Sequence, residues 1–290
     1  MEVELSIVIP AYNEARRIPR YLEAIRRHYA SLSFERYEAI IVDDGSCDRT
    51  SDIVRQAAAD WPQLVLIEHA ANRGKGAAVR TGMLAARGTM VLFADADGAT
   101  PICEEQKLRE AIAAGADVAI GSRRGGPSGP EANRPWYREL AGRTFSKLAR
   151  SYLTLSVADP QCGFKMFRQD TISPLFGPCH EEGYLFDLFV LGAATRIGCR
   201  IDEVPVTWVE IPGSKVNLLR DSWRMLTGLE RIRKSLRRTA LPSRLIVAVP
   251  SSESSTVIDE GVPDDHGAPV ASGLLTESYA GSPVLPRTSV

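Results

Sequence analysis

The sequence predicts an α/β domain built around a mostly parallel central sheet. Short runs rich in β-branched residues alternate with longer segments whose apolar residues recur at helical spacing, and this alternation is typical of repeated βαβ units. Several of the short runs are continuously apolar, as expected for strands that helices cover on both faces. With 290 residues and 44% hydrophobic content, the chain is long enough to bury a large core.

Strands and helices can be assigned in order along residues 1–215, which we expect to form one domain. Each expected strand is a short apolar run bounded by polar or turn-forming residues. The runs lie at residues 5–10, 38–44, 64–69, 89–97 and 117–122. Two later helices are expected at about 136–155 and 184–197, and the sequence DPQCGFKMFR lies between them. A last strand is expected at 201–211.

The remainder of the chain divides into a basic helix and an acidic tail. Residues 216–240 predict an amphipathic helix, and its span 217–239 carries seven basic and two acidic side chains. Such a helix can lie in a membrane interface, or it can dock its apolar face on the domain. From about 245 to 290 the chain is rich in Ser, Pro, Gly and acidic residues without periodicity, which is typical of disorder.

Charge and composition exclude several classes of protein. The net charge is -1, with 35 basic and 36 acidic side chains, so no overall charge favours nucleic acid as a partner. The five cysteines are scattered and lack C-x-x-C spacing, which favours a reducing compartment. The first residues do not form a signal-peptide pattern, and no run of 18 apolar residues occurs. We therefore expect a cytoplasmic protein.

Polar side chains gather where three of the predicted strands end. Because the carboxyl ends of parallel strands border one crevice where ligands bind, we expect these side chains to line a common site. For any single one of them, the alternative is that it caps the next helix. The residues are Asn13, Glu14, Asp43, Asp44, Asp95 and Asp97.

Asp95 and Asp97, in the stretch FADADG, predict a metal site. Two carboxylates at positions i and i+2 beside a core repel one another unless a cation or water compensates them. Magnesium and manganese prefer such oxygen ligands and often complete their shells with substrate phosphates. Asp43 or Asp44 can accept hydrogen bonds from a base or ribose. Lys75 lies between glycines before a helix, where a phosphate can approach, although the glycines can equally form an ordinary turn.

An ordered set of motifs resembles that of the family 2 inverting glycosyltransferases over about residues 4–215. The motifs are SIVIPAYNEARRI, IIVDDGSCDRT, NRGKGAAVRTGMLAARG, FADADGATP, IGSR and DPQCGFKMF. Within this family they are most similar to the polyprenyl-phosphate sugar synthases, and VTWVEIPGSKV resembles the dolichyl-phosphate beta-glucosyltransferase branch. The resemblance implies a GT-A type, Rossmann-like fold that binds a nucleotide-diphospho-sugar.

The resemblance also implies roles for individual residues. Asp95 and Asp97 would bind Mg²⁺ or Mn²⁺ and the diphosphate, which makes Asp97 a catalytic residue. An acceptor phosphate would need cations, which Arg123, Arg138 and Lys215 can supply, and the resemblance favours the two arginines as catalytic residues. The nucleotide sugar would be bound by Pro10, Ala11, Tyr12, Glu14, Asp43, Asp44, Lys75, Asp95 and Ala96.

We therefore expect transfer of a hexose, glucose from UDP-glucose, to a polyprenyl or dolichyl phosphate. A phosphate monoester has a second pKa of ~6, so it is already ionised and needs no strong general base. Three alternatives remain open: mannose transfer from GDP-mannose, a hydroxyl acceptor with Asp159 or Asp187 as the base, and a sugar-nucleotide-binding protein without transferase activity. A lipid acceptor also predicts peripheral attachment to the inner face of a membrane, where residues 217–239 can contact the surface.

Overall fold

The computed structural model describes residues 2–123, 144, 147–209 and 218–242, with 218–226 described as backbone only. All of them belong to one compact unit, Met1–Val247. The helix predicted at 216–240 is therefore part of the same unit as the domain predicted at 1–215. The acidic tail expected at 245–290 lies outside the described residues, as do Arg138 and Lys215.

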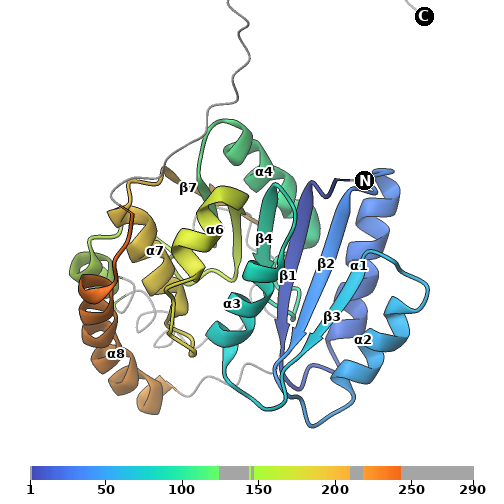
Figure 1. The fold of residues 1–290 in the computed structure, drawn as a ribbon, viewed down its shortest axis with the longest axis horizontal. Helices are drawn as coiled ribbons and strands as arrows, with labels where there is room; N and C mark the ends of the chain where they lie inside the picture. Colours follow the sequence, from blue (N-terminus) through green and yellow to red (C-terminus); the bar gives the residue numbers. More distant parts are fainter. Residues whose placement is uncertain (1, 124–143, 145–146, 210–217, 243–290) are drawn as a thin grey trace, which may run out of the picture. The chain divides into compact units, whose positions relative to one another are not determined.

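Within the described residues, seven strands form one sheet in the order β3-β2-β1-β4-β6-β5-β7 (Figure 1). Strand β6 is antiparallel to both of its neighbours, and every other pair is parallel. The prediction of a mostly parallel sheet is therefore confirmed. The strands are β1 (Leu5–Ala11), β2 (Tyr37–Asp43), β3 (Leu64–Glu68), β4 (Met90–Ala94), β5 (Val118–Ser122), β6 (Phe164–Arg168) and β7 (Ile201–Pro205).

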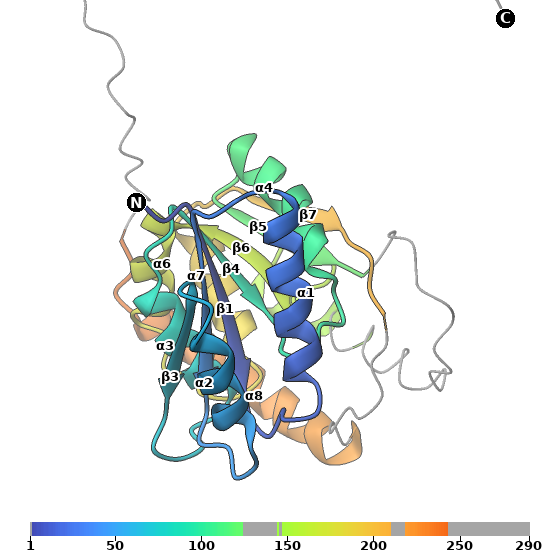
Figure 2. The same cartoon turned by 90° about the vertical axis from the view of Figure 1, so that its right-hand side faces the viewer.

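Helices cover both faces of the sheet (Figures 1 and 2). On one face lie α3 (Lys75–Ala85), α6 (Gln169–Phe176) and α7 (Phe186–Arg196), and α8 (Leu218–Arg238) packs on α7. On the other face lie α1 (Ile18–Ser31), α2 (Thr50–Ala58) and α4 (Glu105–Ala113), which the short 3-10 helix η1 (Ile102–Glu104) precedes. None of the helices in the described ranges has both the length and the apolar character needed to cross a bilayer.

The two faces explain why the strands read as unbroken apolar runs. Successive side chains of a strand point to opposite faces. In β1, Val8 belongs to the core cluster under α3, α6 and α7, whereas Ile7 and Ile9 belong to the cluster under α1 and α4. Every position of such a strand is therefore buried, so polar residues are expected mainly near its ends.

Most predicted elements are confirmed, with three differences. The segment 164–176 contains β6 and α6, which were not predicted. The last strand is shorter than the predicted 201–211, because β7 ends at Pro205, which has no N–H with which to continue a ladder. Half of the helix predicted at about 136–155 lies outside the described residues, and of its described part, residues 144 and 147–153 are helical.

Candidate active site

The ends of strands from both halves of the sheet meet at one edge. The parallel strands β1, β2, β4 and β5 finish there, at Ala11, Asp43, Ala94 and Ser122. Strand β6 runs the other way, so it begins at the same edge, with Phe164 paired to Ala94. Loops from distant parts of the sequence are thereby brought to one place, which is the usual position of a ligand site in an open α/β sheet.

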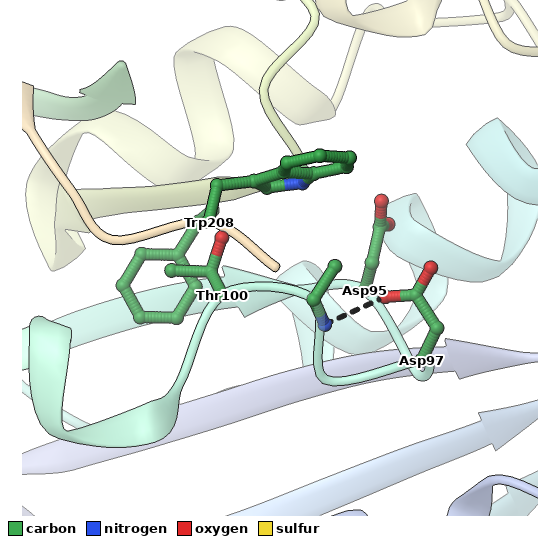
Figure 3. Close-up of a pocket in the computed structure, with 7 residues that line it drawn as sticks. Asp95, Asp97, Thr100 and Trp208 are labelled. Atoms are coloured by element: carbon green, nitrogen blue, oxygen red, sulfur yellow. Dashed lines mark hydrogen bonds between the residues drawn. The ribbon is translucent and has the colours of Figure 1, made fainter. Parts of the chain in front are cut away.

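A pocket at this edge contains both aspartates of the FADADG stretch. Figure 3 shows the two carboxylates next to each other, near the indole ring of Trp208. The Oδ1 atom of Asp97 accepts a hydrogen bond from the N–H of Ala99 at 3.0 Å. Burial raises the pKa of Asp97, and the negative charge of Asp95 raises it further. The pocket is lined by Asp95, Asp97, Ala99, Thr100, Gly163, Phe164 and Trp208.

Asp95 lies in a space that only a glycine at position 163 leaves open. Its N–H donates to the carbonyl oxygen of Gly163 at 3.0 Å, and a Cβ added at Gly163 would lie 2.0 Å from Oδ2 of Asp95. The Nζ atom of Lys75 lies 2.6 Å from Oδ1 of Asp95. Burial opposes the charge on Lys75, but the carboxylates of Asp95 and Asp187 outweigh it and raise the pKa of Lys75. Sequence reasoning missed Gly163, whose only signal was a glycine in DPQCGF.

These residues fit a divalent cation that shares its ligands with a bound phosphate. Asp95 and Asp97 bring two carboxylates to one pocket wall, and the glycine at 163 leaves room for one of them. In the described part of the chain, no group of three or more His, Cys, Asp or Glu side chains is arranged to hold a metal. A cation at Asp95 and Asp97 would therefore need further ligands from a substrate, which is common for Mg²⁺.

Asp44 is buried and fixes the loop that precedes Lys75. Its carboxylate accepts hydrogen bonds from the backbone N–H groups of Arg73 at 3.0 Å and Gly74 at 2.7 Å, and from the side chain of Asn72 at 2.9 Å. Both carboxylate oxygens are thus bonded to protein donors. In this structure Asp44 positions a loop, and its contact with a nucleotide stays a prediction.

Asp43 connects the loops after β1 and β2. It accepts hydrogen bonds from the hydroxyl and, at 3.2 Å, the N–H of Ser46. The same hydroxyl accepts the N–H of Asn13 at 2.9 Å, and the side-chain oxygen of Asn13 accepts the N–H of Cys47 at 2.9 Å. The two loops are therefore held in register by side chains, as a binding surface requires.

The remaining predicted binding residues lie at the same edge. Tyr12 is 40% exposed on the loop after β1, and Glu14 accepts a hydrogen bond from Nε of Arg17 at 2.6 Å. Their contact with a ligand stays a prediction. The structure places the whole predicted nucleotide-sugar set at this edge: Pro10, Ala11, Tyr12, Glu14, Asp43, Asp44, Lys75, Asp95 and Ala96.

Arg123 follows β5 directly and forms a bidentate ion pair with Asp159. Its Nε and Nη2 atoms each lie 2.7 Å from a carboxylate oxygen. Glu203 on β7 in turn accepts the N–H groups of Ala158 at 2.7 Å and Asp159 at 3.0 Å. Burial disfavours the charge of Asp159, but the Arg123 guanidinium outweighs it and holds the pKa of Asp159 below its usual value. Asp159 is therefore placed as the counter-ion of Arg123.

Asp187, the other acidic residue considered as a base, is buried in the first turn of α7. Its Oδ1 atom lies 2.7 Å from Nζ of Lys165, whose side chain is only 1% exposed. Lys165 also donates to the carbonyl oxygen of Cys162. Burial raises the pKa of Asp187, against the opposing effect of Lys165 and Lys75. Sequence reasoning missed Lys165, because a charged residue in a buried strand gives no local signal of its partner.

Comparison with known proteins shows which family the chain resembles. The model of the family described as "Glycosyl transferase family 2" matches residues 6–176. A dolichyl-phosphate beta-glucosyltransferase of Drosophila melanogaster is 39% identical over 229 residues, which are 74% of this chain and 69% of that protein. The protein of the same name from Saccharomyces cerevisiae is 38% identical over 250 residues, which are 80% of this chain and 75% of that protein.

Among solved structures, glucosyl-3-phosphoglycerate synthase from Mycobacterium tuberculosis is similar in fold. Its complex with Mn²⁺, UDP-glucose and phosphoglyceric acid matches with a TM-score of 0.55 at 19% identity, over 79% of each chain. The likeness in fold agrees with the GT-A type architecture that the motifs implied. With the family match over more than half of the chain and relatives at 38–39% identity, this chain belongs to glycosyl transferase family 2.

Proposed function

We propose that the chain transfers glucose from UDP-glucose to a dolichyl or related polyprenyl phosphate, with inversion at the sugar carbon. The observation that carries this proposal is the 33–39% identity to proteins named dolichyl-phosphate beta-glucosyltransferase. It extends over most of the chain, including the strand ends that form the Asp95 and Asp97 pocket. The solved relative that contains UDP-glucose also supports this donor.

On the donor side, we assign the diphosphate to Asp95, Asp97 and Lys75. Asp95 and Asp97 would hold Mg²⁺ or Mn²⁺, which when bound supplies positive charge to the diphosphate leaving group. The solved complex with Mn²⁺ supports this assignment. Lys75, whose ammonium already lies at Asp95, would offer the diphosphate a second cation. The connected loops that carry Tyr12 and Asp43 would bind the base and ribose.

On the acceptor side, the charge pairs of the site favour a phosphate over a hydroxyl group. A hydroxyl acceptor requires a general base, but Asp159 is paired with Arg123 and Asp187 is buried against Lys165. An ionised phosphate requires cations instead. We assign Arg123 to that phosphate, oriented by its ion pair with Asp159, and propose that Arg138 and Lys215 join it.

A polyprenyl phosphate is embedded in a membrane, so the enzyme has to meet it at a surface. We propose peripheral attachment at the cytoplasmic face. The basic residues near the end of α8 support this, because Arg237 and Arg238 are exposed and cations near an anionic surface are attracted to it.

A transfer assay tests the proposal. Labelled UDP-glucose or GDP-mannose is supplied with dolichyl phosphate or with dolichol, in Mn²⁺ or in chelator, and label is counted in an acid-labile lipid fraction. We expect label only from UDP-glucose into dolichyl phosphate, with loss in chelator and in Asp97→Asn. Asp52→Asn, the same chemical change on the exposed surface of α2, should retain transfer.

Three other outcomes would contradict the proposal in different ways. Label from GDP-mannose would identify a mannosyltransferase, and label in dolichol would identify a hydroxyl acceptor. Binding of UDP with no transfer from either donor would identify a sugar-nucleotide-binding protein without transferase activity.

A further inference from the structure

Lys75 compensates the charge of the Asp95 carboxylate that a metal at this pocket would need. Its Nζ atom lies 2.6 Å from Oδ1 of Asp95, at the distance of a strong charge-assisted contact. The Asp95 side chain is 35% exposed and lines the pocket beside Gly163. A divalent cation at Asp95 therefore competes with the ammonium group for the charge of this carboxylate.

The backbone of Lys75 cannot move away with its side chain. A Cβ added at Gly74 would lie 2.4 Å from the carbonyl oxygen of Glu182, and one at Gly76 would lie 2.2 Å from that of Glu181. The N–H of Gly76 also donates to the carbonyl oxygen of Glu182 at 2.8 Å. The turn is thus clamped on both sides of Lys75, and only its flexible four-carbon stem is free to swing.

Other groups near Lys75 can keep its charge stabilised once it leaves Asp95. Its Nζ atom lies 5.9 Å from the ring centre of Tyr184 and 5.4 Å from that of Phe93, within the range of cation–π attraction. Asp187 attracts it electrostatically as well. Tyr184 is 64% exposed, so its ring offers the ammonium group a contact near the protein surface.

We propose that the ammonium group of Lys75 occupies the Asp95 carboxylate until a nucleotide binds, and that metal binding therefore depends on the nucleotide. Without nucleotide, a divalent ion competes with the ammonium group for the Asp95 carboxylate. With nucleotide, the diphosphate draws the ammonium group away and leaves the carboxylate to the ion. The inference rests on the proposed function in that the ligands are a nucleoside diphosphate and a divalent metal. Because coupling between two ligands is reciprocal, Mn²⁺ tightens nucleotide binding by the same factor.

Binding of Mn²⁺, followed by the electron paramagnetic resonance signal of the free ion, tests this without any transfer reaction. Wild type and Lys75→Gln are titrated with Mn²⁺, each with and without UDP. We expect Lys75→Gln to bind Mn²⁺ alone about tenfold more tightly, equivalent to about 1.4 kcal/mol. We expect UDP to tighten Mn²⁺ binding about tenfold more in wild type than in this variant.

Arg17→Gln is the matched control. Arg17 also acts on Asp95 and Asp97 through its charge, but it is bonded to Glu14. Arg17→Gln therefore removes one nearby positive charge but keeps the contact between Lys75 and Asp95. We expect its affinity for Mn²⁺ to change by less than about threefold. Lys75→Arg keeps a cation at the position and should retain the dependence on UDP. Circular dichroism confirms that each variant is folded.

The possible failures are distinguishable. If folded Lys75→Gln binds Mn²⁺ alone no more tightly than wild type, or no more tightly than Arg17→Gln, the inference is wrong and the proposed function is unaffected. If wild type binds no Mn²⁺ even with UDP, the metal assignment and the inference both fail. If the binding results are as expected but no glucose is transferred, the inference holds and the proposed function fails.

Discussion

At the scale of single residues, the carboxylates of the site differ in what holds them. Asp44 is bonded by backbone and side-chain donors of the 72–74 loop. Asp159 is paired with Arg123, and Asp187 with Lys165. Asp95 and Asp97 line the pocket, and Asp95 is also paired with Lys75. The same residue type at neighbouring strand ends thus orients the scaffold in some places and lines the pocket in others.

The Arg123 and Asp159 pair gives a prediction about pH. The pKa of Asp159 is lower in the folded chain than its ordinary 3.8, so the carboxylate stabilises the fold above the unfolded pKa. This contribution is lost as the pH falls through the folded pKa. In Asp159→Asn, the free energy of unfolding should be lower by about 1–3 kcal/mol at pH 7. Between about pH 5 and pH 2 the gap to wild type should close.

Urea unfolding at several pH values measures this gap. Asp52→Asn serves as the control, because Asp52 is more than half exposed in its pair with Arg55, and a surface pair contributes little to stability. A gap between wild type and Asp159→Asn that is constant with pH would contradict the prediction.

At the scale of elements, α8 uses its apolar side to dock on the domain. Leu229, Ile232 and Leu236 are buried in the core cluster that contains α7. Gly192 on α7 makes room for Leu236, whose Cδ1 would lie 2.6 Å from a Cβ added there. This favours the docking alternative for the described half of the helix. A membrane contact through this half therefore has to use its basic side.

We predict that substitutions on the apolar side and on the basic side of α8 have different effects. Ile232→Ala should lower the free energy of unfolding by about 2–4 kcal/mol, because it leaves a cavity against α7. Replacing both Arg237 and Arg238 by Gln should leave stability within about 0.5 kcal/mol. It should also weaken sedimentation with anionic vesicles at low salt by about thirtyfold, since each charge contributes about 1 kcal/mol at such a surface.

The control for the vesicle experiment replaces Arg26 and Arg55 by Gln, because both arginines are exposed on helices of the other face. Sedimentation that is equal in the two double variants would mean that attachment does not depend on the end of α8.

The comparison between sequence and structure also belongs to this scale. The strands β1, β2 and β4 could be predicted because each is apolar on both faces. Strand β6 could not, because it contains the charged Lys165, whose buried ammonium group is paired with Asp187, 22 positions later. The role of Gly163 was hidden for the same reason, since its neighbour Asp95 is distant in the sequence. The strand-end positions of the site were predictable, and the partners of each side chain were not.

At the scale of the whole molecule, the site joins both halves of the sheet. Asp43 ends β2 and Asp95 follows β4, the two strands that pair with β1 on either side, and Gly163 precedes β6. A ligand held by these loops should therefore stabilise the described unit as a whole. With UDP and Mn²⁺ each at about 100 times the dissociation constant, each ligand contributes about 2.7 kcal/mol, and each should raise Tm by about 5–10 °C.

Scanning calorimetry with UDP alone, Mn²⁺ alone and both together measures this rise. Asp97→Asn should remove the part of the shift that depends on Mn²⁺. A constant Tm, while titration calorimetry shows that UDP is bound, would mean that the site opens and closes independently of the rest of the sheet.

The antiparallel direction of β6 has a consequence for engineering and for divergence within the family. Strand β5 ends and β6 begins at the same edge, so the chain leaves the sheet at Arg123 and returns at Phe164 to a neighbouring strand. The Arg123 and Asp159 pair fastens the two ends of this excursion to each other. An exchange of this segment for that of a relative has to keep this pair and the core contacts of Ala149, Leu155 and Val157. Chimeras joined at these two points would show which substrate specificity depends on the exchanged segment and which depends on the rest of the sheet.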